Sequence, residues 1–555
     1  MEKLRMVKQI GIMKAIFQAI ISLSVLTGLV GCAKELEINQ EHPSTDENPM
    51  VVTLTANQEG SDTRAEIGYS DSYTAGIDWS EGDAITVFDG ASANIKFTLA
   101  DGDGTSKGVF QGKVTKLAES YTALYPYQEN VSMDADGILK GVVLKNKQKA
   151  VAGSFDPEAA LMMAKTEAGS KALQFYNIVG FIAVTPEFDC EKITLLSDYH
   201  QATLAGTADI SINNGKPVVE SISGSGFDRV SIEGDIKANN TYYIAALPGA
   251  MYSFKLIFTD KDGNDTFKES DPSKNSLYIE RSNIVNLGSI ASDLPEFIPY
   301  VSFKSSAGKQ KFSMKLVDGI GPFEYSVNNG EWKTVQSEEK VAFGGDLGDL
   351  RLRGVSGCGT AIDNTHYSKV SFHDNVISYG SYDVQLSVEC MGDIRTLIDW
   401  KNYKKVDTKN ASFAHLFYGT TLMSAPDLPA TELAPSCYYN MFACSSLEAA
   451  PELPATTLTP NCYEEMFKGC SILTTAVIWG ESLAKDCYKN MFSNCNRISD
   501  IRFMSHKDYP SSVEDYGANW LENTYRSATI HKRSGVVLPE GWIPSGWTVS
   551  EDVVD

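Results

Sequence analysis

The feature that most constrains this 555-residue chain is a repeat of 25 residues that runs through positions 411–508. Apolar columns keep this step, and they are Leu416-Phe417, Met441-Phe442, Met466-Phe467 and Met491-Phe492, together with Cys437, Cys462 and Cys487, each of which is followed by a tyrosine. A fixed short period predicts coils that stack on one another, because no single unit can bury its apolar face alone. Such a stack presents one extended surface, and this geometry favours binding over catalysis.

Within each unit the apolar spacing predicts a short helix. Leu433, Cys437 and Met441 stand four residues apart, as on one helix face, and Pro435 fits a first turn, where no amide donor is needed. The Leu-Pro stretch at 428–429 predicts an extended edge, since the residue before proline avoids the helical region. We therefore expect short helices that alternate with extended segments.

Six of the ten cysteines belong to the repeat, at positions 437, 444, 462, 470, 487 and 495. If the segment between the two cysteines of a unit is helical, they lie about 10 Å apart along the axis, beyond the ~7 Å between Cα atoms that a disulfide permits. We expect small buried apolar side chains here, preferred over disulfides. Zinc is disfavoured because the chain has no Cys-x-x-Cys spacing and no paired histidines.

Aromatic side chains of the repeat are the candidate ligand contacts. Tyr438, Tyr463 and Tyr488 form a series beside the cysteine column, and this series is exposed if the cysteines point inward. Tyrosine is a favoured interface residue, although it also fills the edges of cores. Trp479 interrupts the Leu-Pro pattern of the third unit and is either an exposed contact or the start of capping.

The first residues predict export. Four basic residues precede an apolar run at 15–30 that is too short for a membrane span, and Met13 is an alternative start. The run ends in Leu29-Val30-Gly31-Cys32, which resembles the lipobox of bacterial lipoproteins and implies cleavage of residues 1–31 and acylation of Cys32. Polar residues at 32–49 then predict a tether.

Composition bears on the class of partner. The net charge of −23 disfavours nucleic acid, because an acidic surface repels phosphate backbones. The seven histidines are scattered, and the sequence has no nucleophile motif, phosphate loop or His-Glu-x-x-His pair. We therefore expect a protein that is not an enzyme, with no catalytic residues, cofactor or metal; the acidic run at 260–265 predicts a hairpin turn rather than a calcium loop.

Residues 50–293 consist of short alternating runs broken by Gly, Asp and Asn, which predict β-sandwich lobes. Residues 297–390 predict a further small β domain, in which Asn329 and Gly330 supply the positive φ angles of a hairpin turn. The expected fold class is therefore mostly β, with tandem sandwich lobes, a small β domain and a C-terminal solenoid with short helices.

Two family resemblances refine this division. Residues 50–293 resemble the fimbrillin or Mfa-like lipoproteins, through motifs in shared order: Asp62-Thr63-Arg64-Ala65, Trp79-Ser80-Glu81-Gly82-Asp83-Ala84-Ile85, Phe155-Asp156-Pro157, Leu173-Gln174-Phe175-Tyr176-Asn177, Tyr243-Ile244-Ala245-Ala246-Leu247-Pro248-Gly249 and Asn283-Ile284-Val285-Asn286-Leu287-Gly288. That family implies an N-lobe at 50–185 and a C-lobe at 186–293. The Leu-Pro-Ala-Thr runs followed by Cys-Tyr-x-x-Met-Phe resemble BspA-like leucine-rich repeats, at 391–509, with a C-terminal cap at 510–555.

These resemblances imply an outer-membrane lipoprotein, anchored at Cys32 and exposed on the cell surface or in a fimbria. The fimbrillin likeness also implies proteolysis at Arg64, followed by strand exchange with fimbrial subunits, although a plain exposed arginine is an equal alternative. The expected function is an adhesin or fimbria-associated protein, for instance at a fimbrial tip, whose repeats bind a host protein, a bacterial surface or a glycan. The alternative is a surface glycan-binding lipoprotein of a nutrient-uptake system.

Overall fold

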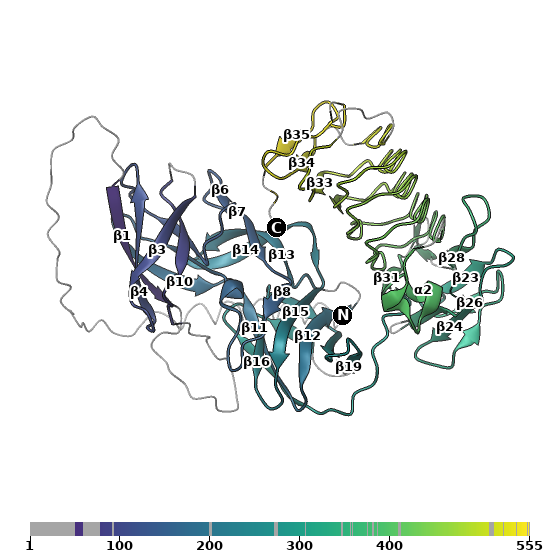
Figure 1. Ribbon diagram of the computed structural model, residues 1–555, viewed down its shortest axis with the longest axis horizontal. Helices are drawn as coiled ribbons and strands as arrows, with labels where there is room; N and C mark the ends of the chain where they lie inside the picture. Colours follow the sequence, from purple (N-terminus) through teal and green to yellow (C-terminus); the bar gives the residue numbers. More distant parts are fainter. Residues whose placement is uncertain are drawn as a thin grey trace. The chain divides into compact units, whose positions relative to one another are not determined.

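The computed structural model describes residues 50–553 apart from 59–77, 91–93, 199–201, 271–275, 306, 346–347, 356, 358, 375, 380–381, 386, 409–411, 510–515, 525–526, 540 and 552. These residues form a mostly β protein (Figure 1). Helix in the described part of the chain is limited to three short segments, η1 (Pro157–Ala159), α2 (Thr396–Asp399) and η3 (Tyr403–Lys405).

The first lobe is a closed barrel of seven strands in the order β1-β10-β9-β5-β2-β3-β4, where a sandwich was expected. The strands are β1 (Met50–Gln58), β2 (Ala84–Phe88), β3 (Ile95–Asp101), β4 (Lys107–Val114), β5 (Thr122–Tyr125), β9 (Met162–Lys165) and β10 (Ala172–Asn177). The ring closes because β1 pairs with β4 on one side and with β10 on the other. Trp79 is fully buried inside it, with edge-to-face contacts to Phe110 and Tyr125 at ring-centroid distances of 5.0 and 5.1 Å.

In the sequence, the strands of the second lobe lie both before and after the barrel strands β9 and β10: β6, β7 and β8 precede them, and β11 to β21 follow them. Its strands are β6 (Ser132–Met133), β7 (Leu139–Leu144), β8 (Lys147–Lys149), β11 (Gly180–Pro186), β12 (Cys190–Ser197), β13 (Ala205–Asn213), β14 (Lys216–Phe227), β15 (Arg229–Ile236), β16 (Tyr242–Ala246), β17 (Gly249–Met251), β18 (Phe254–Thr259), β19 (Asp265–Glu269), β20 (Leu277–Ile279) and β21 (Ile284–Ile290). They form the sheets β19-β18-β12-β15-β8, β14-β13-β7-β6, β16-β11-β21 and β17-β20. The expected division at residue 186 therefore misplaces β6, β7, β8 and β11, whose partners are strands of the second lobe.

The small β domain follows the second lobe. Its strands are β22 (Val301–Ser305), β23 (Lys311–Lys315), β24 (Phe323–Val327), β25 (Lys333–Thr334), β26 (Val341–Ala342), β27 (Gly348–Gly354), β28 (Lys369–His373), β29 (Val376–Tyr379), β30 (Tyr382–Gln385) and β31 (Glu389–Met391). The expected hairpin joins β24 and β25, but its positive φ angles belong to Asn328 and Asn329, one residue earlier than predicted. Asparagine tolerates this conformation better than most residues, so Gly330 is not required for it.

The repeat region is a stack of coils, and its turns are not α-helices. In each coil every fourth residue has a positive φ, and these residues are Ser436, Asn440 and Cys444, then Asn461, Glu465 and Gly469, then Asp486, Asn490 and Asn494. A left-handed residue ends an α-helix, so the expected short helices are wrong. Amides that a helix would use internally donate instead to the next coil, as Tyr438 does to the carbonyl of Cys462 at 3.1 Å.

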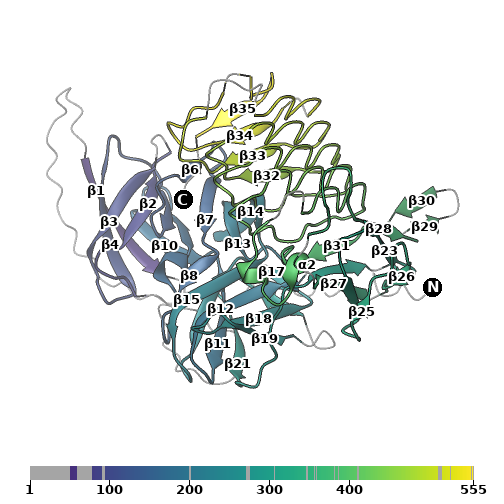
Figure 2. The same ribbon diagram turned by 45° about the vertical axis from the view of Figure 1, so that its right-hand side comes forward.

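Parallel pairing at the 25-residue step holds the coils together. Isolated parallel bridges join Glu432 to Thr457 and Thr457 to Ser482. A parallel sheet then forms at the end of the stack from β32 (Thr475–Ile478), β33 (Asp500–Phe503), β34 (Thr529–His531) and β35 (Thr548–Ser550), which lie side by side in Figure 2. Because β34 and β35 lie in the expected cap, the sheet extends past residue 509.

One hydrophobic core runs from the small β domain to the last residues of the stack. Its centre is a column of Phe417, Phe442, Phe467 and Phe492, with neighbouring ring centroids 5.5 to 5.8 Å apart. Phe303 of β22 contacts the first ring of this column at 6.1 Å, and Trp520 contacts the last at 6.0 Å. The small β domain therefore covers one end of the stack, and the tryptophan-rich C-terminal segment covers the other.

Candidate binding surface

The tyrosines predicted to contact a ligand are inside the stack. Tyr438, Tyr463 and Tyr488 are 1%, 1% and 0% exposed, and their rings stack face to face at 5.9 and 6.1 Å. The expected exposure is therefore wrong: in a coil of successive turns a cysteine and the tyrosine after it both face the core, unlike on a strand, where side chains alternate. Burial raises the pKa of Tyr463 well above its ordinary value, and Tyr438 Oη and Tyr488 Oη have no hydrogen-bond partner among the described residues.

Five of the six repeat cysteines are buried, as expected for small apolar side chains: Cys437, Cys462, Cys470, Cys487 and Cys495. Their thiols are free, and burial raises the pKa of Cys487 to about 12, which makes it a poor nucleophile. Cys444 differs because it is exposed. The helical spacing used to argue against disulfides was wrong, and the expected burial is confirmed for these five cysteines but wrong for Cys444.

Trp479 lies half-buried at the end of β32. Its indole Nε1 donates to the Glu452 carboxylate of the preceding coil at 3.1 Å, and burial raises the pKa of that carboxyl group. The stack continues beyond this residue, so Trp479 does not begin a cap. A role of Trp479 as a ligand contact stays a prediction. The one polar atom of its side chain, Nε1, is already bonded to Glu452.

The residue after each buried tyrosine belongs to a polar row at the side of the stack, in which Tyr439 and Lys489 are half-buried and Glu464 is 8% exposed. The sequence reasoning missed this row. Lys489 Nζ pairs with Glu464 at 2.9 Å, and this bond raises the pKa of Lys489. In the neighbouring column, Glu465 pairs with Lys468 at 2.6 Å and accepts a hydrogen bond from Asn490 at 3.3 Å. A signal was present, because positions 439, 464 and 489 change chemical type while the tyrosine before each does not.

Aromatic side chains gather where this row meets the small β domain. The aromatic cluster consists of Tyr367, His415, Tyr418 and Tyr439. His415 stacks on Tyr367 with ring centroids 4.1 Å apart and contacts Tyr418 and Tyr439 edge to face at 6.1 and 5.2 Å. Tyr418 is 37% exposed, and Lys369 Nζ lies 4.7 Å from the centre of its ring.

Two backbone features fix the position of the His415 side chain: its own positive φ angle and the carbonyl group of Asn364. Its φ is +57°, and its Nε2 lies 3.1 Å from the carbonyl oxygen of Asn364, to which the neutral imidazole donates. Burial lowers the pKa of His415, and the bond to Asn364 opposes that shift. The ring is therefore neutral near pH 7 and anchored in the middle of the aromatic cluster.

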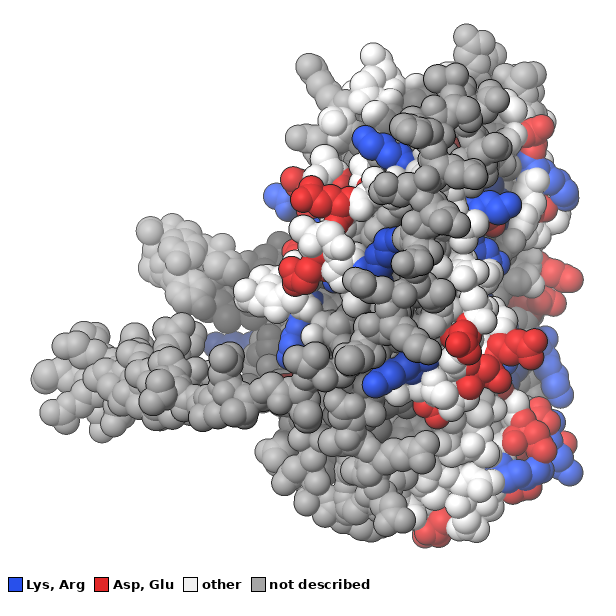
Figure 3. Space-filling view, turned by 90° about the vertical axis from the view of Figure 1, so that its left-hand side faces the viewer, with Lys and Arg blue, Asp and Glu red and all other residues white. Residues whose placement is uncertain are grey.

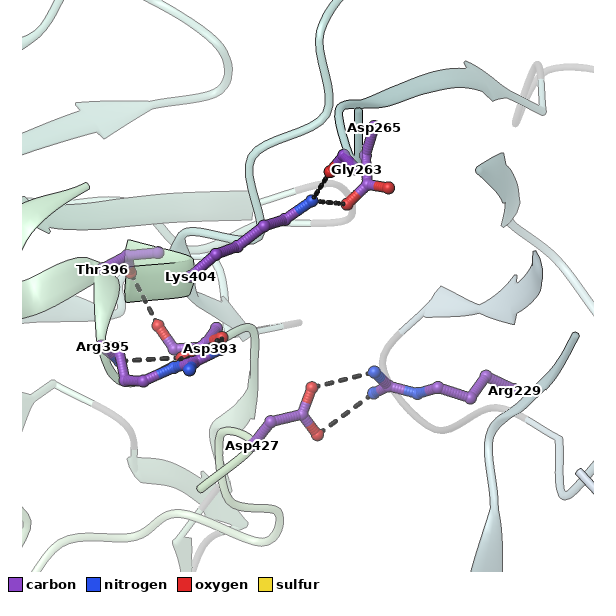
Figure 4. Close-up of polar contacts among 8 residues, drawn as sticks. All are labelled: Arg229, Gly263, Asp265, Asp393, Arg395, Thr396, Lys404 and Asp427. Atoms are coloured by element: carbon purple, nitrogen blue, oxygen red, sulfur yellow. Dashed lines mark hydrogen bonds and ion pairs between the residues drawn. The ribbon is translucent and has the colours of Figure 1, made fainter. Parts of the chain in front are cut away.

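A second group of polar contacts involves the second lobe and the first coils (Figure 4). Arg229 forms a two-point ion pair with Asp427, with nitrogen to oxygen distances of 3.0 and 3.1 Å, and Lys404 Nζ pairs with Asp265 at 2.7 Å. Arg395 pairs with Asp393 at 2.8 Å. Since Arg229, Asp427 and Lys404 are each more than a third exposed, the first two pairs are worth about 0–1 kcal/mol apiece.

A pocket opens beside the Arg229–Asp427 ion pair, with apolar walls that include Leu196, Phe267 and Met391. Each of its cationic side chains already pairs with a carboxylate: Arg229 with Asp228, Lys255 with Asp198 and Arg351 with Asp349. The polar groups of this pocket therefore serve the fold, and we assign no ligand to it.

The remaining candidate positions lie elsewhere. Cys32 and Arg64 fall outside the described residues. Among the residues that are described, no group of three or more His, Cys, Asp and Glu side chains is arranged to hold a metal ion, and no helix has the length and apolar character to cross a membrane. On the face shown in Figure 3, acidic and basic side chains are interspersed.

No protein-family model matches this chain, and no curated protein sequence is similar to it. Similar solved structures include a Bacteroides uniformis protein provisionally assigned to cell adhesion, with a TM-score of 0.28 and 16% identity, over 44% of this chain and 96% of that one. A fimbrial protein of Bacteroides ovatus has a TM-score of 0.21 and 12% identity, over 47% and 53% of the two chains. A leucine-rich repeat protein of Bacteroides thetaiotaomicron has a TM-score of 0.12 and 7% identity, over 44% and 26%.

TM-scores this low carry no assignment of family or function.

Proposed function

We propose that this chain is a cell-surface binding protein, an adhesin or fimbria-associated lipoprotein, and not an enzyme. The observation that carries the proposal is the stack itself. Its phenylalanine and tyrosine columns repeat at ring-centroid distances of 5.5 to 6.1 Å, so the interior is uniform. Positions 439, 464 and 489 at the side of the stack hold Tyr, Glu and Lys, of which Glu464 is 8% exposed and the other two are half-buried, so that a regular scaffold carries varied residues at its side. Rigid scaffolds with variable outer residues are suited to recognition.

The proposal extends to family and location. We infer a fimbrillin or Mfa-like N-terminal part, a BspA-like leucine-rich-repeat part and an outer-membrane anchor at acylated Cys32. Three features support this inference: the ordered motifs, the burial of motif residues Trp79 and Phe175 in one barrel, and the parallel bridges at the repeat step. Cleavage at Arg64 with strand exchange into a fimbria is the alternative route to the cell surface, because it removes Cys32 and its lipid.

The N-terminus of the mature protein on intact cells tests the anchor. Mass spectrometry of purified and surface-shaved material should find a chain that begins at acylated Cys32. A chain that begins at Ala65 would mean that β1 is lost together with the lipid, and that fimbrial partners alone hold the protein on the cell. A chain that still carries residues 1–31 would contradict both anchoring routes.

Adhesion itself is tested by truncation after Ile298. Cells that display the shortened protein should lose attachment to the partner surface and keep the protein on the cell. The cut is placed beyond Phe297 so that this residue stays with the second lobe. Its amide donates to the carbonyl of Asp265, and its ring packs on Phe267 with centroids 5.4 Å apart. Attachment that persists without residues 299–555 would overturn a binding role for the repeats.

The alternative is capture of polysaccharide for a nutrient-uptake system. The aromatic cluster favours this reading, because partly exposed aromatic rings next to polar groups are suited to sugars. Growth on a polysaccharide that depends on residues 299–555, without any effect on attachment, would support the alternative over the adhesin.

A further inference from the structure

We propose that the aromatic cluster is a binding site for the neutral pyranose units of a glycan, with Tyr418 as the stacking platform. This inference rests on the proposed function and names the ligand class of its binding surface. The cluster lies at the first two coils, where His415 and Tyr418 of one coil meet Tyr439 of the next and Tyr367 of the small β domain.

The rings of the cluster are held in place before any ligand arrives. His415 is clamped between its bond to Asn364 and the stacked ring of Tyr367, and Ala361 and Ala414 pack beneath Tyr367 and Tyr439. Tyr418 and Tyr439 each meet the imidazole with an edge-to-face contact. Such preorganisation lowers the entropy lost on binding, which matters most for weak ligands.

The chemistry of Tyr418 selects the kind of ligand. An aromatic face carries negative charge and attracts the C–H groups on one side of a pyranose ring. Lys369 Nζ lies over one face of this ring, 4.7 Å from its centre, which leaves the other face for the sugar. At the edge of the ring its ammonium group can donate to sugar hydroxyls. A cationic ligand is disfavoured at the same ring, because it would meet the charge of Lys369.

The polar rim argues against an anionic ligand. Beyond Tyr439 lie Glu464 and Glu465, whose charges raise the pKa of the Tyr439 hydroxyl after burial, the largest cause. Lys489 and Lys468 pair with these two carboxylates at 2.9 and 2.6 Å, so their charges are balanced. These paired groups add no net charge to that of Lys369, and the ammonium groups of Lys489 and Lys468, whose side chains are 37% and 38% exposed, offer donors to hydroxyl groups. A neutral sugar fits these features together.

The experiment uses the full mature chain and defined oligosaccharides. Maltohexaose, mannohexaose and a neutral galactan represent neutral pyranoses, and oligogalacturonate represents an anionic sugar. Isothermal titration calorimetry should detect binding of at least one neutral probe and a weaker response to oligogalacturonate. Tyr418→Ala should weaken that binding by about tenfold, as expected when an aromatic contact is lost, whereas Tyr418→Phe should stay within about twofold.

Tyr278→Ala is the matched control, because Tyr278 is 57% exposed on β20 of the second lobe and should not change binding. Circular dichroism should be unchanged in all three variants. The inference is overturned if no neutral probe binds at millimolar concentration, if Tyr418→Ala binds as well as the unaltered chain, or if only oligogalacturonate binds.

This outcome is separable from the proposed function. If attachment still depends on residues 299–555 while all neutral probes fail, the adhesin stands and the glycan inference falls. Where a neutral probe binds, its source is tested by competition. Soluble probe that blocks cell attachment supports a glycan on the partner surface, whereas binding with no effect on attachment supports a soluble polysaccharide.

Discussion

The buried hydroxyl groups of the tyrosine column lead to two predictions of opposite sign for the free energy of unfolding. Tyr438 Oη has no partner among the described residues, and an unsatisfied buried polar group costs about 1–3 kcal/mol. Tyr438→Phe should therefore raise the free energy of unfolding by about 1 kcal/mol, and Tyr438→Ala should lower it by about 3–5 kcal/mol through the cavity it leaves. Urea unfolding of both variants checks this, and a destabilised Phe variant would show that the hydroxyl is satisfied.

Histidine burial predicts a pH dependence of stability. The pKa of His415 and that of His373 are both lowered by burial, with Lys340 opposing protonation of His373 and Glu465 favouring that of His415. Below about pH 6.5, the ordinary pKa of histidine, the unfolded chain therefore binds more protons than the folded chain. The free energy of unfolding should fall as the pH drops from about 6.5 towards the lowered pKa values of the folded protein.

His415→Asn should flatten part of this slope, and asparagine tolerates the positive φ at that position. The measurement is urea unfolding at a series of pH values from 7.5 to 5. A slope unchanged in the variant would rule out His415 as a contributor.

At the scale of the element, the coil depends on residues that accept a left-handed backbone. Asn494 has a φ of +62° and is exposed, whereas Asn496, two residues later, is exposed with a negative φ. Asn494→Val should cost about 1–2 kcal/mol, because a β-branched side chain is strained there. Asn496→Val should stay within about 0.5 kcal/mol, and Asn494→Gly should fold normally. Thermal unfolding measures both variants, and an equal loss of stability in the two would contradict a left-handed backbone at Asn494.

The turn elements also show what a sequence pattern misses. Leu433, Cys437 and Met441 have helical spacing, yet the left-handed residues between them make a series of turns. Asparagine, aspartate, serine or glycine stands at most of these positions, four residues apart, and that spacing was the available signal. The apolar spacing alone did not separate the two structures, because both bring every fourth side chain to one side.

At the scale of the molecule, the shared core predicts where the chain can be divided. Val301 and Phe303 of the small β domain belong to the same core as Phe417 and the rest of the stack. A fragment of residues 50–390 should therefore aggregate or be rapidly proteolysed, and a fragment of residues 50–298 should be soluble and folded. Loss of the Arg229–Asp427 and Lys404–Asp265 ion pairs at the second cut should cost little.

Limited proteolysis and size-exclusion chromatography of the two fragments test this division, with residues 299–555 as the complementary fragment. A stable, monomeric 50–390 fragment would mean that the small β domain has a core of its own. The same result would move the cut of the adhesion experiment to residue 391, where the repeats were expected to begin.

The sequence by itself determined the β-rich character of the chain, the 25-residue step and the burial of its apolar columns. These properties depend on local composition and on contacts between neighbouring coils, which a period records directly. Only the tertiary structure decided that Tyr438, Tyr463 and Tyr488 face inward, that the first lobe closes into a barrel, and that the small β domain shares the core of the stack. Those outcomes depend on the sign of φ at single residues and on pairing between distant strands, such as β1 with β10, neither of which leaves a period in the sequence.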